Sequence, residues 1–347
     1  MTVSIKDIAK QANVSTATVS LALNKKQSSF ISKATRQRIL ELAKELNYRP
    51  NVLARGLVKK KTNTIGVVIP DVIYPFFTEV IHGIETLANE SDHKIILCYS
   101  GSKQEKEAEY VNMLLEQRVE GIIIAPLADN RNIKIFKRLI QDGFPLVFVD
   151  RYLDEVNGSY VVTDNAKGAY KAVRHLVKLG HKRILLLTTG TKISTVQSYL
   201  EGYKKALAKD NLSYRESLIK RCEETEAGEN RLFLGYNIMK SFLLKKPHFT
   251  AVFATDDNFA VGAIKAVKEK ELRVPEDIAV VGFDDLPFSS FVDPPLTSVM
   301  QQKYEMGEKA VKTLIEIVKK DDVQLRKILL EPKLVIRQSC GGGARIK

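Results

Sequence analysis

Acidic residues stand at or just after the ends of several β-rich runs of the sequence, where their side chains could bind the hydroxyl groups of a ligand. Asp150, Asp257 and Asp284 are such residues, and Phe76 and Phe77 follow the first run. Carboxylates accept paired hydrogen bonds from hydroxyls, and an aromatic ring covers the apolar face of a sugar. Singly, each acid could instead cap the next helix, and each phenylalanine could lie in the core. Together they suit a pocket for a polyhydroxylated ring.

Motifs for catalysis and for metal binding are missing from the sequence. It contains no GxxxxGK[ST], no GxGxxG after the first run, no HExxH and no GxSxG. The five histidines have no metal-ligand spacing, and the paired aspartates serve sugar binding as well as glycosidase chemistry. We therefore expect a protein that is not an enzyme and that has no catalytic residue, no metal and no cofactor.

The elements that must position these acids are parallel sheets. Continuous apolar runs alternate with helical stretches of ten or more residues, as in sheets that are buried on both faces. These runs are 65–69, 95–99, 121–125, 146–150, 161–163, 184–188, 251–254 and 278–283. They predict two doubly wound α/β units that divide near residue 163, with ligand bound at the carboxyl ends of the strands.

Length and charge divide the chain further. Its 347 residues are enough for two or three domains, and no apolar run approaches the ~20 residues that span a bilayer. Residues 1–61 hold 13 Lys and Arg against three acids, a net charge of +10, whereas the other 286 residues carry only +3. A small basic head on a nearly neutral body is typical of a nucleic-acid-binding module. We expect no membrane segment or signal peptide, and three well-separated cysteines fit reduced thiols in the cytoplasm.

The apolar spacing of this head predicts a helix-turn-helix. Ser15 is a good N-cap for a second helix over 16–24, and Thr16, Ala17, Thr18 and Ser20 leave a small polar face. Such a helix can enter the major groove, where short side chains allow close approach to base edges. A third helix follows Ser32. The alternatives are a basic helical bundle and a helix-turn-helix that contacts protein.

A short helical segment follows the head. Asn51 can cap residues 52–57, but six residues including Gly56 cannot hold a helix alone in water. We expect this segment to become ordered only on a partner.

These segments resemble the head of LacI/GalR-type bacterial regulators. The resemblance rests on residues 4–9, 14–20, 46–51 and 54–57. It implies base contacts from Thr16, Ala17 and Leu21, with Thr18 and Ser20 holding the helix on the DNA backbone. We expect Ser15 and Asn51 to be DNA-binding residues as well. It also implies a hinge helix with minor-groove contacts from Ala54, Arg55 and Leu57, the leucine acting as a wedge at the central base step. Leu21 replaces the polar residue that the family often has there.

The same resemblance extends over nearly the whole chain. It rests on residues 74–77, 163–168, 179–181, 253–257, 274–284, 295–299 and 334–339. It implies an effector domain like a periplasmic binding protein, with Phe76, Phe77, Asp150, Asp257 and Asp284 lining the cleft between two subdomains. Tyr199 occupies a position where many sugar-responding relatives have arginine, and it cannot form the guanidinium fork.

The resemblance implies a cytoplasmic homodimer that regulates transcription, a repressor that binds a near-palindromic operator and is switched by a small molecule, a carbohydrate by the chemistry of the cleft. One alternative is a plain sugar-binding protein; another is a regulator that is switched by a partner such as a phosphocarrier protein. The expected parts are a helix-turn-helix domain (1–50), a hinge helix and linker (51–63), a first subdomain (64–162 and 293–325), a second subdomain (163–292 and 326–340) and a flexible tail (341–347).

Overall fold

The computed structural model consists of two compact units, Met1–Thr62 and Asn63–Lys347. It describes residues 3–23, 31–48, 62–127, 130–190, 194–222, 230–245, 248–319 and 325–342. The hinge segment 51–61 and residues 343–347 of the expected tail lie outside the described residues.

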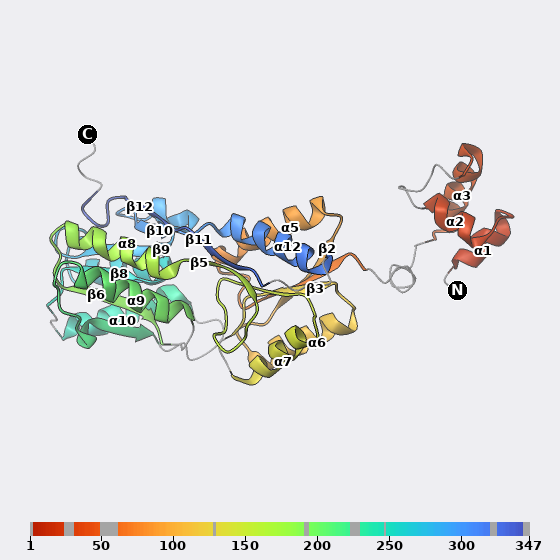
Figure 1. Cartoon of the computed structure of the whole chain (residues 1–347). Helices are drawn as coiled ribbons and strands as arrows, with labels where there is room; N and C mark the ends of the chain where they lie inside the picture. The colour runs from red at the N-terminus through yellow and green to blue at the C-terminus, as the bar shows by residue number, and fades with distance from the viewer. Residues whose placement is uncertain are drawn as a thin grey trace. The chain divides into compact units, whose positions relative to one another are not determined.

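The described residues of the first unit form three helices (Figure 1): α1 (Ile5–Gln11), α2 (Thr16–Leu23) and α3 (Lys33–Glu45). A serine directly precedes each helix and caps its start. Ser4 forms a capping box with Asp7, and the Oγ atoms of Ser15 and Ser32 accept the backbone N–H groups of Thr18 and Thr35, both at 3.1 Å. These caps fix where the helices start, because they satisfy N–H groups that have no partner within the helix.

The turn between α1 and α2 is set by Asn13, whose φ of 48° lies in the left-handed region that asparagine tolerates. Ile8, Val19 and Ile39, one from each helix, are fully buried at the centre of the unit's small core. The unit is therefore a helix-turn-helix braced by a third helix.

The second unit contains two six-stranded sheets. The first has the order β11-β5-β4-β3-β1-β2, and all of its pairings are parallel. Its strands are β1 (Thr64–Ile69), β2 (Lys94–Tyr99), β3 (Gly121–Ile124), β4 (Leu146–Val149), β5 (Ser159–Thr163) and β11 (Lys327–Leu330). The second has the order β12-β10-β9-β8-β6-β7, and only β12 is antiparallel to its neighbour. Its strands are β6 (Ile184–Thr189), β7 (Ile219–Cys222), β8 (Ala251–Ala254), β9 (Ala279–Asp284), β10 (Thr297–Met300) and β12 (Lys333–Val335).

Helices cover both faces of each sheet. In Figure 1, α5 (Pro75–Glu90) and α12 (Lys303–Lys319) lie on one face of the first sheet, and α6 (Gln104–Glu116) and α7 (Asn130–Gln141) lie on the other. On the second sheet, α8 (Asn165–Lys178) and α9 (Ser194–Ala208) pack together, as do α10 (Arg231–Leu244) and α11 (Asp257–Lys268). The four resulting clusters of buried apolar side chains explain the continuous apolar strands.

Two expected segment assignments are wrong. The sequence places residues 293–325 in the first subdomain, but β10 pairs with β9 in the second sheet, and only α12 returns to the first. It places residues 326–340 in the second subdomain, but β11 pairs with β5 in the first sheet before β12 joins the second. The chain therefore crosses between the sheets at three places, after β5, between β10 and α12, and between β11 and β12.

Candidate functional site

The outer face of α2 is small and uncharged. Thr16, Ala17 and Ser20 are exposed, and Leu21 is half-buried. Thr18 is engaged within the head, because its backbone N–H and its hydroxyl both form hydrogen bonds with Ser15 Oγ, the hydroxyl at 2.9 Å. Of the expected base-reading residues, Thr16 and Ala17 are thus the most accessible.

Basic side chains of the head have two roles. Lys6, Lys10 and Lys44 are exposed and available to a polyanion. By contrast, Arg36 donates to the carbonyl of Ala22 at 3.3 Å, and Arg38 donates to that of Ala12. These two arginines therefore tie α3 to the ends of α1 and α2. Four expected DNA-binding residues lie outside the described residues: Asn51, and the minor-groove residues Ala54, Arg55 and Leu57.

A pocket in the second unit lies between the two sheets, at the carboxyl ends of their strands. Five of the six residues that we expect in the cleft line it, namely Phe76, Phe77, Asp150, Tyr199 and Asp284. The other lining residues are Tyr74, Arg151, Thr189, Thr195, Arg231, Thr255, Asp256 and Gln301. Phe76 and Phe77 are also core residues, only 1% and 2% exposed, so they form the floor and offer little free surface.

Asp257 does not line this pocket, and the expectation that it would is wrong in this respect. Its carboxylate points into the protein, where it accepts hydrogen bonds from Leu286 N, Ser289 Oγ and Ser298 Oγ at 2.8, 2.7 and 2.6 Å. The pocket residue is its neighbour Asp256, the N-cap of α11. Asp256 accepts the backbone N–H of Asn258 at the start of α11, whereas the side chain of Asp257 reaches Ser298 on β10.

The cleft is narrow, and contacts between the two subdomains cross it. The hydroxyl of Tyr74 donates to Asp284 Oδ2, and Arg231 lies over the Tyr74 ring, 4.9 Å from its centre. Ser194 Oγ donates to the carbonyl of Tyr152 at 3.0 Å. The remaining cavity has a volume of about 70 Å³, room for a few water molecules but below the ~300 Å³ of small ligand pockets. A ligand must therefore widen the cleft in order to enter it.

Each carboxylate in the cleft already has partners. Arg151 Nε lies 2.8 Å from Asp150, Arg231 lies 2.8 Å from Asp256, and Gln301 Nε2 donates to Asp284 Oδ1 at 2.5 Å. Burial, followed by the charges of Asp256 and Asp257, raises the pKa of Asp284 well above its usual range. The same causes, burial and nearby aspartates, raise the pKa of the phenols of Tyr74 and Tyr199.

Backbone geometry fixes Asp284 in place. Its φ of 106° and that of Asp285, 50°, lie in a region that residues other than glycine seldom adopt. Lys303, at the start of α12 and 3% exposed, donates to the carbonyls of Asp284 and Asp285 at 2.7 and 3.1 Å. Arg337 forms an ion pair with the Asp285 carboxylate, with 2.6 Å between Nη1 and Oδ1. The strained turn thus presents one carboxylate to the cleft and anchors the next.

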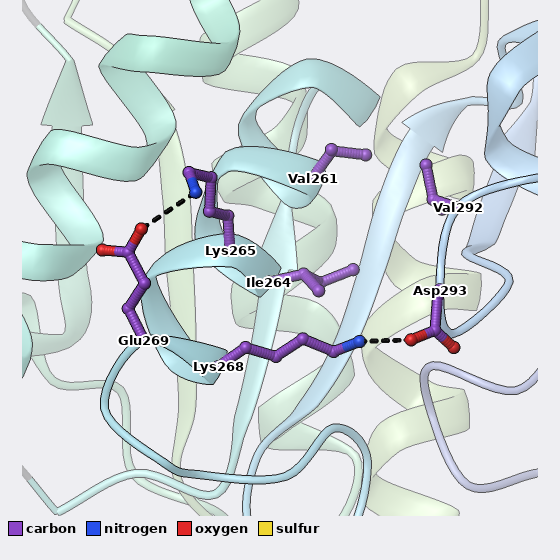
Figure 2. A pocket seen from close by; sticks show the side chains of 7 residues that line it. All are labelled: Val261, Ile264, Lys265, Lys268, Glu269, Val292 and Asp293. Atoms are coloured by element: carbon purple, nitrogen blue, oxygen red, sulfur yellow. Dashed lines mark hydrogen bonds and ion pairs between the residues drawn. The ribbon is translucent and has the colours of Figure 1, made fainter.

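A second hollow lies on the surface of the second subdomain and has a volume of about 490 Å³ (Figure 2). Its floor is apolar, formed by Val261 and Ile264 of α11 and by Val292. Ion pairs border it, Lys265 with Glu269 at 2.9 Å and Lys268 with Asp293 at 2.5 Å. No sequence motif points to this surface.

Two family models match the chain. The model for bacterial regulatory proteins of the lacI family matches residues 4–51, and that for a periplasmic binding protein-like domain matches residues 173–340. The ribose operon repressor of Haemophilus influenzae is 33% identical over 336 residues, which cover 96% of this chain and 98% of that protein. This chain belongs to the LacI family. The family resemblance is thereby confirmed.

Solved LacI-family structures match both units. The lac repressor dimer bound to operator and the anti-inducer ONPF has a TM-score of 0.85 at 28% identity, covering 98% of this chain and 99% of that one. A complex of the transcriptional regulator CelR with cellobiose has a TM-score of 0.73 at 26% identity, covering 97% and 99%. The expected fold class is confirmed, and this LacI-family chain is a DNA-binding transcriptional regulator.

Metal-binding clusters and membrane spans are absent from the part of the chain that the structure describes. Its residues include no group of three or more His, Cys, Asp and Glu side chains that could hold a metal ion. Among the same residues there is also no helix long and apolar enough to cross a membrane.

Proposed function

We propose that this LacI-family regulator is a cytoplasmic repressor that binds a near-palindromic operator as a homodimer and responds to a small polyhydroxylated molecule in the cleft. The observation that carries the DNA part is the exposed face of α2, with Thr16 and Ala17 at its N-terminal end. Recognition helices meet base edges with these first residues. The exposed lysines around the helix supply attraction to phosphates without sequence preference.

Selection of bound fragments from random duplexes by the full chain tests this role. We expect one palindromic consensus, and we expect Thr16→Ala to change the preferred base at one position of each half-site. The matched control is Lys44→Ala, an exposed lysine on α3. It should weaken binding evenly across sequences and reduce the slope of log affinity against log salt by about one. An unchanged consensus with Thr16→Ala would remove this residue from base reading.

The homodimer is supported by the hollow beside α11. Its apolar floor and its balanced border of two lysines and two acids, Lys265, Lys268, Glu269 and Asp293, are complementary to a second copy of themselves. A two-fold axis brings each patch against its own copy, so the two apolar floors can meet, and the borders do not repel each other because each is already balanced in charge. We propose that two chains meet here.

A small-molecule effector is supported by the cleft, which combines three aspartates with the rings of Tyr74 and Tyr199. The match to a regulator solved with cellobiose supports a carbohydrate. One observation favours the alternative of a partner protein such as a phosphocarrier: each cleft carboxylate is already paired within the chain. Calorimetric titration of the full chain with D-ribose and cellobiose tests the first possibility, and absence of binding by a wider sugar panel would favour the second.

A further inference from the structure

Tyr74 belongs to the first subdomain, but its polar contacts lie on the second. It is the N-cap of α5 and precedes Pro75, so its side chain extends beyond the helix start toward the cleft. Its hydroxyl donates to Asp284 at the end of β9, and its ring faces Arg231 at the start of α10. Phe76 supports the ring from its own side, with 6.0 Å between ring centres and 24° between planes. The side chain therefore bridges the mouth of the cleft.

The partners of Tyr74 are the groups that would bind a ligand. One carboxylate oxygen of Asp284 accepts a hydrogen bond from the Gln301 amide, and the other accepts one from the Tyr74 hydroxyl. Arg231 is shared between the Tyr74 ring and Asp256. In a cavity of only about 70 Å³, no ligand ring fits while this arrangement stands. A hydroxyl that binds Asp284 Oδ2 must take the place of the tyrosine hydroxyl.

We propose that Tyr74 is an internal latch: in the ligand-free protein its hydroxyl occupies Asp284 and holds the cleft closed, and an effector binds by displacing it. The proposal deepens the proposed function, because it concerns the site where the effector binds. It makes Tyr74 a determinant of effector affinity through competition. The apparent dissociation constant is the intrinsic one divided by the unlatched fraction, so a strong latch weakens binding.

The direct test measures the cleft without any ligand. Spin labels at Asp154→Cys and Glu201→Cys report on its width, since these exposed residues of opposite subdomains both lie near Tyr152. The native cysteines Cys98, Cys222 and Cys340 are buried and leave the introduced thiols as the labelling sites. Pulsed electron resonance on the full chain then gives the distribution of distances between the labels.

Tyr74→Phe keeps the ring and its contact with Arg231 but removes the hydroxyl. We expect a population of longer distances, raised roughly 2- to 10-fold relative to the unchanged protein, the net effect of removing one hydrogen bond. Tyr110→Phe is the matched control, because Tyr110 lies on α6 outside the cleft lining and no hydrogen bond of its hydroxyl is found within the described part of the chain. A distribution for Tyr74→Phe that equals the control would overturn the latch.

Calorimetry with D-ribose and cellobiose separates the latch from the proposed function. Tighter sugar binding by Tyr74→Phe than by the unchanged chain supports the latch. Weaker binding overturns it, because Tyr74 would then be a ligand contact. If the cleft opens in Tyr74→Phe but neither sugar binds either protein, the latch stands and the proposed response to these sugars fails.

Discussion

Asp256 and Asp257 are neighbours in the chain, but their carboxylates act in different places. Asp256 faces the cleft and pairs with Arg231. Asp257 is fully buried and accepts hydrogen bonds from two serine hydroxyls and from the backbone N–H of Leu286. The side chain of Leu286 lies in the core of the first subdomain. Asp257 thus fastens the segment after β9 to the second subdomain at the point where it touches the first.

Burial raises the pKa of Asp257 to about 7, although hydrogen bonds from Ser298, Ser289 and Leu286 lower it in part. Between about pH 4, where an ordinary aspartate titrates, and about pH 7, the folded state holds this proton and the unfolded state does not. The free energy of unfolding should therefore fall as pH rises through this window, by at most about 1.4 kcal/mol per pH unit from this group. We expect Asp257→Asn to lose that part of the slope.

Urea unfolding at pH values from 4.5 to 7.5 measures this effect. The difference between the two proteins reports the proton on Asp257 together with its effect on Asp284, because the charge of Asp257 contributes to the raised pKa of Asp284. Parallel profiles of stability against pH would show that the folded state does not hold the proton on Asp257.

Single residues also mark the limit of sequence reasoning. The strand ends and most cleft residues could be predicted, since parallel strands bring their carboxyl ends together. Which of two adjacent aspartates faces the cleft could not, because it depends on the residue at which α11 begins. Arg231 lies far from the other cleft residues in the sequence, and no motif marks it. Tyr74 stands in a recognised motif, but its partner Asp284 is 210 positions away.

Helices α5 and α12 position the residues by which the first subdomain contributes to the cleft. Tyr74 precedes α5, Lys303 begins α12, and Lys303 Nζ lies 3.2 Å from Glu79 of α5. Glycines let the two helices approach closely: a Cβ at Gly83 would lie 2.1 Å from the Tyr304 carbonyl oxygen, and one at Gly307 would lie 2.2 Å from that of Val80. The position of Lys303, and with it the Asp284 turn, depends on this contact.

Gly83→Ala should therefore destabilise the effector domain by about 1–3 kcal/mol or more, as overpacking does, despite the better helix propensity of alanine. Thermal unfolding measures the change. The control is Glu85→Ala on the exposed side of the same helix, which should shift stability by no more than about 0.5 kcal/mol. An unchanged melting temperature in Gly83→Ala would mean that the two helices can separate without cost.

Strands are predictable in the sheet centres and less so at the edges. The central strands are apolar throughout because helices cover both faces. Strand β7 at one edge reads Ile-Lys-Arg-Cys, β11 and β12 are short edge strands, and β10 carries Thr and Ser that bond Arg337 N and Asp257. Strands β7, β10 and β12 lack the apolar run that identifies the others, and β11 has only the three apolar residues Ile-Leu-Leu. For this reason the pattern places the two segments after β9 in the wrong subdomains.

At the scale of the whole molecule, the function that we propose requires two chains on one operator. The apolar floor beside α11 is the surface that we assign to their contact. Replacing Val261 and Val292 together by glutamate should bury four unpaired carboxylates in a two-fold interface, which is prohibitive. Sedimentation should then show monomers in place of dimers.

The control is Phe233→Glu, which places one glutamate at an apolar residue of α10 that is 63% exposed and outside the hollow. It should leave the dimer intact. A Val261→Glu/Val292→Glu protein that remains dimeric would move the interface elsewhere.

The central claim is that ligand in the cleft and operator at the head are coupled through one protein. Coupling is reciprocal: if a compound changes operator affinity by some factor, operator changes the compound's affinity by the same factor, typically about 5- to 150-fold. The measurement is calorimetric titration of a sugar that binds the cleft into the full chain, alone and saturated with its selected operator duplex. The account predicts two dissociation constants that differ by the factor found in operator binding with and without the sugar. Equal dissociation constants would contradict it and would favour a partner protein as the switch.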